Sequence, residues 1–467
     1  MASLADELRS WAERSRQRAE SLALVPRLEQ VGRVLQVGDG VASVAGLPDT
    51  RLDELLVFAG GVRAMAVDRG EESIGCVLLG DAKGIAAGSL VHGTGEALLG
   101  RADDALGAPG DGLGPLETTG FLPVERPAPA IVDRAPVTRP LATGLLVIDA
   151  MIPLGRGQRE LIIGDRETGK TAIAVDAIIN QRSSGVICVY AAIGQKASSV
   201  ARVIEAVRRH GAPQRCLFVI GEATAAPGLQ WLTPYSACAM AEHFMERGRD
   251  VLLVIDDLTK HAAAWRQVSL LLRRPPGREA YPGDIFYVHS RLLERAAKLS
   301  EERGGGSLTA LPIAETQAGN ISAYIPTNLI SITDGQVYLD PRLFYEDQKP
   351  AVDVGKSVSR VGGKTQAPVL KPLAESLRLE YAQFLELEVF TRFGTMVDDR
   401  TRKAIERGRR IRAVLAQRQF APLALGEQVA LLHAAAEGVL DDLPLERIEA
   451  FSAGVGAWLA ARCPEVP

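Results

Sequence analysis

A glycine-rich segment between a short apolar run and a helical pattern constrains this chain more than any other stretch. Residues 161–163 have the composition of a buried strand, and apolar residues recur at helical spacing over 173–179. The segment between them fills the pattern G-x-x-x-x-G-K-T with Gly164, Asp165, Arg166, Glu167, Thr168, Gly169, Lys170 and Thr171. Such a loop points backbone N–H groups at a phosphate beside a helix N-terminus. It predicts a nucleotide site with Lys170 at the β- and γ-phosphates and Thr171 in a Mg²⁺ shell.

A second apolar run, residues 251–255, ends in the two acids Asp256 and Asp257. A buried strand that delivers a carboxylate beside a phosphate loop supplies what Mg²⁺ coordination requires, usually through water. We therefore predict Asp256 as the acidic partner of Thr171 at the metal, with Asp257 as the alternative. Strands also end in aspartate at ordinary turns, so this prediction depends on the phosphate loop earlier in the chain.

Hydrolysis requires one more group, a base or water-positioning side chain near the γ-phosphate. A natural source is the end of the strand after the phosphate-loop helix, expected at residues 186–191. The critical position is occupied by Gln195, whose amide cannot accept a proton as a carboxylate does. Glutamine orients water in some GTPases, so chemistry alone does not exclude turnover at this site. The lack of a carboxylate nevertheless makes turnover less favoured.

Composition excludes several classes of protein. A net charge of −4 gives no general attraction to nucleic acid or acidic lipid. The five cysteines are scattered without C-x-x-C spacing, which indicates reduced thiols and no structural zinc, and we assign none of the six histidines to a metal. No apolar run approaches the ~18 residues of a transmembrane helix. The N-terminus lacks the apolar core of a signal peptide, and its acids argue against a transit peptide.

A chain of 467 residues exceeds a single hydrophobic core. The pattern of apolar, glycine and proline residues along it indicates separate regions. Residues 2–24 suggest an exposed amphipathic helix, with a frayed terminus as the alternative. Short apolar runs separated by regular turns from 29 to about 98 predict a small β-barrel or sandwich. Residues 99–140, rich in glycine and proline, read as an irregular connector.

The second part of the chain changes to an α/β pattern and then to helices. From about 141 to 366, helical stretches separate buried-type strands at 161–163, 186–191, 217–220 and 251–255, which predicts a mostly parallel sheet covered on both faces. After about 368 the pattern is helical, with helices expected at 373–393 and 400–418 and alanine-rich segments beyond them.

Several long motifs give the chain a clear resemblance. It resembles the α subunit of rotary F-type ATP synthases in residues 155–166, 168–171, 192–196, 273–284, 315–319 and 357–362. The similarity runs from about residue 30 nearly to the C-terminus. The resemblance implies a multi-domain α/β fold: an N-terminal β-barrel, a central RecA-like P-loop domain with a mostly parallel sheet, and a C-terminal helical domain. We place an N-terminal helix at 1–28, the barrel at 29–98, the connector and nucleotide domain at 99–366, and the helical domain at 367–467.

The resemblance also implies an assembly and a location. Three such chains would alternate with three catalytic β subunits around a rotating γ subunit, and the N-terminal helix would contact a peripheral stalk or δ-type subunit. The α chain would bind ATP or ADP with Mg²⁺ without turning it over, whereas the family's β chain has glutamate where Gln195 stands. Contact with the membrane would come only through the ion-translocating sector, at the cytoplasmic face of a bacterial or archaeal cell membrane.

Further site residues are implied by the same resemblance. Arg360 matches the arginine that the α chain lends to the β active site, and Ser357, Val358 and Ser359 precede it, with the two serines expected to position it. Without the motif match, Arg360 would read as a surface ion-pair residue. The family's adenine pocket carries over to Gln417, Gln419 and the segment 344–350; exposed amides at a helix end are the alternative.

This sequence departs from the family pattern at several positions. Glu167 replaces the usual glutamine of the phosphate loop, and its charge should weaken triphosphate binding unless it points outward or pairs with Arg166. Ala197 stands where the family usually has a basic residue, and Lys349 stands in place of an arginine. The sequence stops at Pro467, short of the family's last helices. These departures suggest a divergent or alternate α chain. A Na⁺-transporting ATPase is one hypothesis for its complex, with protons as the other coupling ion.

Three other functions remain as alternatives. A self-sufficient ATPase motor subunit is disfavoured by Gln195 and by the α-type form of residues 357–362. A nucleic-acid motor would favour a basic channel or stacking aromatic residues, whereas here the net charge is negative and aromatic residues make up 5%. A purely structural chain with a decayed nucleotide site is disfavoured by Lys170 and Asp256 but kept open by Glu167.

Overall fold

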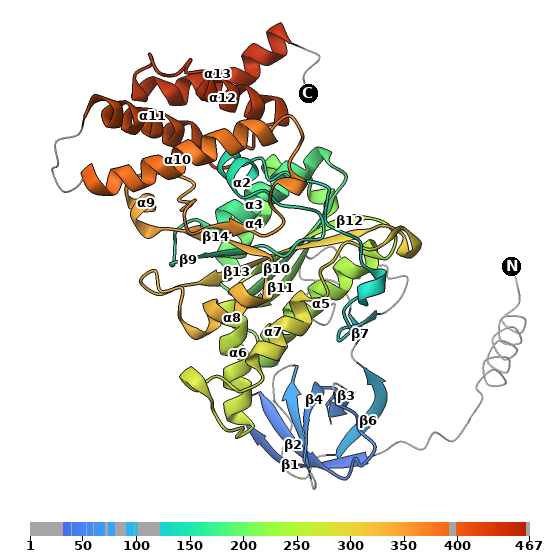
Figure 1. The fold of residues 1–467 in the computed structure, drawn as a ribbon. Coiled ribbons are helices and arrows are strands. Elements are labelled where there is room, and N and C mark those ends of the chain that lie inside the picture. Colours follow the sequence, from blue (N-terminus) through green and yellow to red (C-terminus); the bar gives the residue numbers. More distant parts are fainter. Residues whose placement is uncertain are drawn as a thin grey trace, which may run out of the picture.

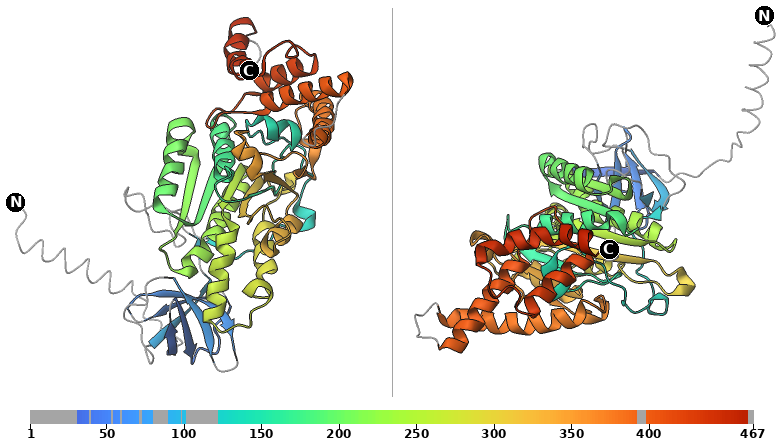
Figure 2. Two further views of the ribbon diagram at one scale, coloured as in Figure 1. Left: turned by 90° about the vertical axis from the view of Figure 1, so that its left-hand side faces the viewer. Right: turned by 90° about the horizontal axis from the view of Figure 1, so that it is seen from above.

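The computed structural model describes residues 31–391 and 398–463, except 39, 53, 59, 71–72, 80–89, 98 and 101–121. The N-terminal helix expected at 2–24 and most of the glycine-rich part of the connector lie outside the described residues. A barrel stands at one end of the molecule, a helical region at the other, and a sheet covered by helices lies between them (Figure 1 and Figure 2). The predicted fold class is therefore confirmed.

The barrel is closed by antiparallel pairing in the order β1-β2-β5-β4-β3-β6, with β6 returning to β1. Its strands are β1 (Val31–Gly38), β2 (Val41–Ala45), β3 (Glu54–Phe58), β4 (Arg63–Arg69), β5 (Ile74–Leu78) and β6 (Leu90–Ala97). Alternating side chains such as Val44, Leu56 and Leu78 point inward and are fully buried. The short apolar runs of residues 29–98 that were predicted to be strands therefore form strands of this barrel. Because the barrel is closed, these strands have no free edge.

A seven-stranded sheet in the order β11-β10-β12-β13-β9-β14-β15 forms the middle of the molecule. All neighbouring pairs are parallel except β14 and β15. The strands are β9 (Leu161–Gly164), β10 (Ile187–Gln195), β11 (Cys216–Glu222), β12 (Asp250–Asp256), β13 (Ser307–Glu315), β14 (Gly335–Leu339) and β15 (Val358–Ser359). A two-stranded pair, β7 (Leu99–Gly100) with β8 (Leu122–Pro123), belongs to the connector.

Helices cover both faces of this sheet, as expected for parallel strands that are apolar throughout. One face packs against α2 (Leu146–Met151), α3 (Lys170–Asn180) and α4 (Ala197–His210). The other packs against α5 (Pro227–Met245), α6 (Leu258–Leu271), α7 (Ile285–Leu293) and α8 (Tyr324–Ile332). The second core includes the barrel residues Val41, Met65 and Val77, so barrel and sheet domain share apolar packing.

The helical region consists of α10 (Lys371–Thr391), α11 (Asp399–Leu415), α12 (Leu425–Ala436) and α13 (Leu445–Arg462), after a short α9 (Pro341–Tyr345). Helix α11 starts at Asp398, whose carboxylate accepts a hydrogen bond from the Thr401 N–H over 2.7 Å. The prediction that this helix reaches residue 418 is wrong, because the backbone becomes extended at Ala416. Residues from this region share one core with α2, α3 and α4.

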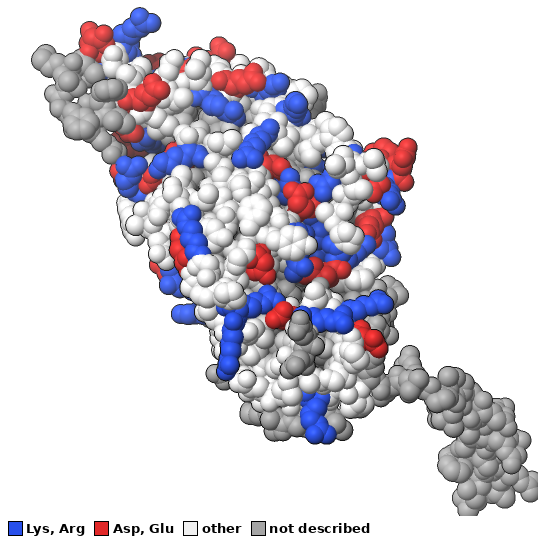
Figure 3. Space-filling view, turned by 60° about the horizontal axis from the view of Figure 1, so that its bottom comes forward, with Lys and Arg blue, Asp and Glu red and all other residues white. Residues whose placement is uncertain are grey.

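Charges of both signs are interspersed over the face seen in Figure 3, between large uncharged areas. On that face, lysine and arginine do not gather into a single basic field.

Candidate nucleotide-binding site

The phosphate loop connects the carboxyl end of β9 to the first residue of α3. Gly169 has φ of 99° and Glu167 has φ of 63°, so the loop curls through left-handed conformations just before the helix begins at Lys170. At Gly164, a Cβ atom would lie 2.8 Å from the Leu339 carbonyl oxygen, which only glycine permits. The loop therefore has the strand–loop–helix context that the sequence pattern requires.

Asp165 holds the loop in place, a role that sequence reasoning missed. Its Oδ1 accepts hydrogen bonds from Thr316 Oγ1 over 2.5 Å and from the Gly319 N–H over 2.8 Å. These contacts join the loop to residues 316–319, which follow the end of β13. Lys170 Nζ donates to the Asp165 carbonyl oxygen over 2.6 Å. Burial lowers the pKa of Lys170, although Glu315 and the neighbouring aspartates favour its charged form.

The two predicted metal ligands are brought together. Thr171 Oγ1 donates to Asp256 Oδ2 over 2.8 Å, and the buried Tyr190 hydroxyl donates to the same oxygen over 2.7 Å. The donor set consists of oxygen atoms at the phosphate loop, which fits Mg²⁺. Sequence reasoning missed Tyr190; its position on β10, beside β12, depends on the order of strands in the sheet.

Asp257, the alternative ligand, is committed to a different contact. Its Oδ1 accepts a hydrogen bond from the Lys260 N–H over 2.7 Å and so caps α6. Burial, reinforced by the nearby Asp256 carboxylate, raises the pKa of Asp257 to about 7. Because Asp257 caps α6 while Asp256 contacts Thr171, the geometry favours Asp256 as the metal ligand.

Gln195, at the end of β10, is fixed from both sides. Its Nε2 donates to Asp256 Oδ1 over 3.0 Å, and its Oε1 accepts from Lys260 Nζ over 2.8 Å. Both polar atoms of the amide are therefore engaged, and neither can take a proton from water. Lys260 was not foreseen from sequence, because nothing in the local pattern of α6 indicates which strand end it faces.

A cleft of about 910 Å³ extends from the phosphate loop to the helical region. It is lined on the loop side by Glu167, Thr168 and Gly169, and on the far side by Phe344, Lys349, Pro350, Gln417 and Gln419. The segments predicted from the resemblance as phosphate loop and adenine pocket therefore share one cavity. Its volume lies within the range of small-molecule sites.

The two glutamines of the predicted adenine pocket differ in what they contact. Gln417 Nε2 donates to the carbonyl oxygens of Gly144 (2.8 Å) and Ala421 (2.7 Å), and its Oε1 accepts from the Leu146 N–H over 3.0 Å. This amide links the helical region to the start of α2. Gln419 is exposed, lines the cleft and has no hydrogen-bond partner within the described part of the chain. Among the described contacts, Gln419 is therefore the glutamine of the two whose amide is available to a nucleotide base.

Glu167 and Arg166 are both exposed at the tip of the loop. Glu167 lines the cleft, and it forms no ion pair with Arg166 or with any other described residue. Because the side chain borders the cavity without a cationic partner among the described residues, neither condition that would remove its repulsion from phosphates is met.

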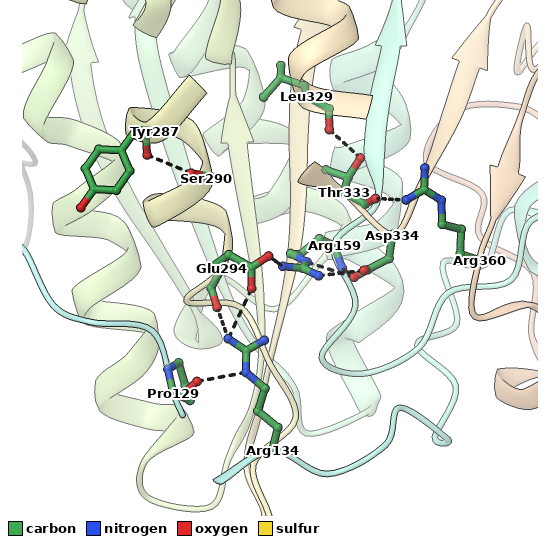
Figure 4. A network of polar contacts seen from close by, with 10 residues as sticks. All are labelled: Pro129, Arg134, Arg159, Tyr287, Ser290, Glu294, Leu329, Thr333, Asp334 and Arg360. Atoms are coloured by element: carbon green, nitrogen blue, oxygen red, sulfur yellow. Dashed lines mark hydrogen bonds and ion pairs between the residues drawn. The ribbon is translucent and has the colours of Figure 1, made fainter. Parts of the chain in front are cut away.

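Arg360 follows β15, which pairs with the amino end of β14, whereas the phosphate loop follows the carboxyl end of the neighbouring parallel strand β9. Figure 4 shows Arg360 beside Thr333 and Asp334. The Arg360 N–H donates to the Asp334 carbonyl oxygen over 2.8 Å, and Asp334 accepts from the Arg159 N–H over 3.0 Å at the amino end of β9. Five residues of extended chain separate Arg159 from Gly164, roughly 16 Å at ~3.3 Å per residue. Arg360 is exposed, its side chain donates to the Thr333 carbonyl oxygen at 3.3 Å, and its charge opposes the rise in the pKa of Glu160 that burial causes.

The residues before Arg360 hold the strand that carries it. Ser357 Oγ donates to the Asp353 carbonyl oxygen over 2.7 Å and accepts from the Tyr338 N–H over 2.9 Å. Ser359 Oγ donates to the Pro153 carbonyl oxygen over 2.7 Å. Val358, between them, is 45% exposed and points outward. The serines therefore fasten β15 to the domain beneath it.

A wider network surrounds the base of this strand. Arg159 pairs with Asp334 over 2.8 Å and also with Glu294, and Glu294 pairs with Arg134 over 3.4 Å (Figure 4). The backbone of residues 333–334, which carries both contacts of Arg360, is thus held by a bidentate arginine–carboxylate contact.

Fold and site together define a P-loop nucleotide-binding protein with a barrel and a helical region on either side of its sheet. Family comparisons match the β-barrel domain of the ATP synthase alpha/beta family over residues 28–95, its nucleotide-binding domain over 144–359 and its C-terminal domain over 366–467. The chain belongs to the ATP synthase alpha/beta family.

The similar curated proteins are α subunits. The chain is 58% identical over 460 residues to ATP synthase subunit alpha 3 of Paraburkholderia xenovorans, covering 97% of this chain and 87% of the relative. It is 56% identical over 469 residues to ATP synthase subunit alpha 2 of Gluconobacter oxydans, covering 99% and 92%. The resemblance to the α chain of F-type ATP synthases is confirmed, and the numbering of these relatives agrees with an alternate α chain. The coupling ion stays untested.

Helices able to cross a membrane and clusters of potential metal-ligating side chains were both sought among the described residues, and neither was found. The structure corrects one detail of the sequence analysis: the cysteines are not all apart, because Cys188 and Cys216 are register partners on β10 and β11.

Proposed function

We propose that this chain is the noncatalytic, regulatory α subunit of an F-type ATP synthase, which binds ATP or ADP with Mg²⁺ and completes a β-subunit active site with Arg360. The complex would make ATP from ADP and phosphate with a transmembrane ion gradient, or run in reverse. The observation that carries the proposal is the engaged amide of Gln195 beside Asp256.

The residues of the cleft would divide the work of holding a nucleotide. The N–H groups of the loop and of the first turn of α3 would face the phosphates, and Lys170 would leave the Asp165 carbonyl for them. Thr171 and Asp256 would hold Mg²⁺, which when bound would neutralise phosphate charge. Gln195 would keep Asp256 oriented without accepting a proton from water. The site would retain nucleotide rather than hydrolyse it.

The location of Arg360 supports a role in a neighbouring subunit. It lies at the amino end of β14, away from its own phosphate loop at the carboxyl end of β9, and it is exposed, with a side-chain hydrogen bond to the Thr333 carbonyl oxygen at 3.3 Å and an electrostatic interaction with Glu160. A guanidinium in this position can contact a phosphoryl group bidentately, and such arginines contribute ~10³–10⁵ in rate in related NTPases. The partners would be β and γ subunits in an alternating α₃β₃ ring, with a peripheral stalk or δ-type subunit, at the cytoplasmic face of the membrane.

The test compares MgATP binding and hydrolysis by the purified chain with those of the chain after addition of its β and γ partners. We expect binding without turnover by the chain alone, and hydrolysis only on assembly. Steady turnover by the lone chain, lost in the Lys170→Ala variant, would support the self-sufficient ATPase instead. Absence of MgATP binding would support a structural chain with a decayed site.

A further inference from the structure

Two cysteines from different parts of the sequence meet at the amino ends of neighbouring strands. Cys188 on β10 and Cys216 on β11 are direct partners in the parallel register. Neighbouring strands lie about 4.8 Å apart, and partners in register project to the same face. A disulfide requires Cα atoms about 4.4–6.8 Å apart, so this backbone spacing is compatible with one.

The two thiols have different environments. Cys188 is 2% exposed and packs into the core beneath α3 and α4. Cys216 is the first residue of β11 and is partly exposed, and its thiol donates to the Ala212 carbonyl oxygen over 3.4 Å. The neighbouring Cys188 thiol lowers the pKa of Cys216, whereas the proximity of Cys216 and burial raise the pKa of Cys188. The partly exposed Cys216 thus lies beside the buried Cys188, as an attacking cysteine lies beside a resolving one.

We propose that Cys188 and Cys216 form a dithiol redox site that a low-molecular-weight disulfide, such as oxidised glutathione, converts to an intramolecular disulfide. The Cys216 thiolate attacks one sulfur of the oxidant and releases one thiol, which leaves a mixed disulfide. Cys188 then attacks the Cys216 sulfur and releases the second thiol. Both cysteines are oxidised, the oxidant is reduced to two thiols, and the two cysteine protons pass to these products.

This site is separate from the nucleotide site, although both use β10. Cys188 lies at the amino end of the strand and Gln195 at its carboxyl end, roughly 23 Å apart at ~3.3 Å per residue. Oxidation should therefore leave MgATP binding unchanged. Its structural effect falls on β11, the edge strand of the sheet, which the new bond would fasten to β10. Disulfides of reduced compartments are usually transient or redox-sensing, which fits a pair at an edge strand.

The experiment equilibrates the full chain with mixtures of oxidised and reduced glutathione and maps the disulfides by mass spectrometry. We expect a Cys188–Cys216 bond that reverses with dithiothreitol, and slower amide hydrogen exchange in β11 when it is formed. The Cys216→Ser variant should form no intramolecular bond, whereas the control Cys238→Ser, which removes a buried cysteine elsewhere, should oxidise as the native chain does.

Two results would overturn the proposal. One is a pair that stays reduced under a ratio at which the partly exposed Cys463 is already glutathionylated. The other is oxidation that stops at a mixed disulfide on Cys216. Because MgATP binding is measured on the same samples, failure of the redox site and failure of the nucleotide site give distinct outcomes.

Discussion

The amide nitrogen of Gln195 donates a hydrogen bond over 3.0 Å to Oδ1 of Asp256, while the other oxygen of that carboxylate accepts from Thr171. One carboxylate therefore connects the residue at the position of a catalytic base to the predicted metal ligand of the phosphate loop. Lys260 also holds the amide, so under the proposed function the site would keep a bound nucleotide without hydrolysing it.

Lys170→Ala should weaken MgATP binding by the isolated chain by roughly 10- to 100-fold, because hydrogen bonds to charged groups contribute about 1.5–3 kcal/mol. Turnover by the assembled complex should fall far less, since under the proposed function this chain's nucleotide would not be the one hydrolysed. Equilibrium binding and steady-state hydrolysis measure the two effects. Lys403→Ala, at an exposed position of α11, is the control. A variant that binds normally but abolishes turnover would refute the noncatalytic assignment.

Glu167→Gln should tighten MgATP binding by roughly fivefold, because two charges about 4 Å apart interact by about 1 kcal/mol in water. Glu167 lines the cleft without an ion-pair partner among the described residues, so its removal relieves repulsion and breaks no contact. The gain should shrink as salt is added. The control is Glu437→Gln, exposed at the end of α12. An unchanged affinity at low salt would show that Glu167 points away from the phosphates.

Gln417→Ala and Gln419→Ala should separate stability from binding. The first removes an amide that joins Gly144, Leu146 and Ala421, which should cost about 1–3 kcal/mol of unfolding free energy. The second should leave stability unchanged and weaken nucleotide binding through loss of a free amide at the cleft. Denaturant unfolding and nucleotide titration measure both variants. The reverse pattern would assign base contact to Gln417.

Asp176→Asn should change how stability depends on pH. Burial raises the pKa of Asp176 from 3.8 to about 6, and its Oδ1 accepts from the Phe420 N–H over 2.8 Å, a bond that asparagine can keep. Between pH 3.8 and about pH 6, Asp176 is protonated in the native state and ionised in the unfolded state. Its contribution to the free energy of unfolding therefore declines as the pH rises. From pH 5 to 7 the native chain should lose about 1 kcal/mol relative to the variant. If the native chain and the variant lost the same free energy of unfolding between pH 5 and pH 7, the raised pKa of Asp176 would be excluded.

Local patterns allowed the strands and the phosphate loop to be predicted from sequence. The apolar runs at 161–163 and 251–255 fall within β9 and β12, and the glycine-lysine-threonine segment has the expected turn and helix. These features depend on neighbours in the chain, which is why spacing alone reveals them.

Contacts between distant elements could not be predicted in the same way. The bonds of Gln195 to Asp256 and Lys260 exist because β10 pairs with β12 and α6 follows β12. The pairing of Cys188 with Cys216 depends on β11 lying beside β10. Helix α11 ends at Leu415, where helical periodicity suggests continuation, because Gln417 bonds to Lys349 and Gly144 instead. In each case the contact or the helix end depends on elements that are distant in the sequence, so local patterns do not reveal it.

The central claim, that this chain completes a neighbour's active site, rests on Arg360 and is tested most directly by its removal. The measurement is multisite MgATP hydrolysis by complexes assembled with native or Arg360→Ala chains, with Arg409→Ala, exposed on α11, as the control. We predict a loss of roughly 10³-fold or more for Arg360→Ala, with assembly and MgATP binding by this chain intact. Turnover retained at the native rate would contradict the account and remove Arg360 from the mechanism.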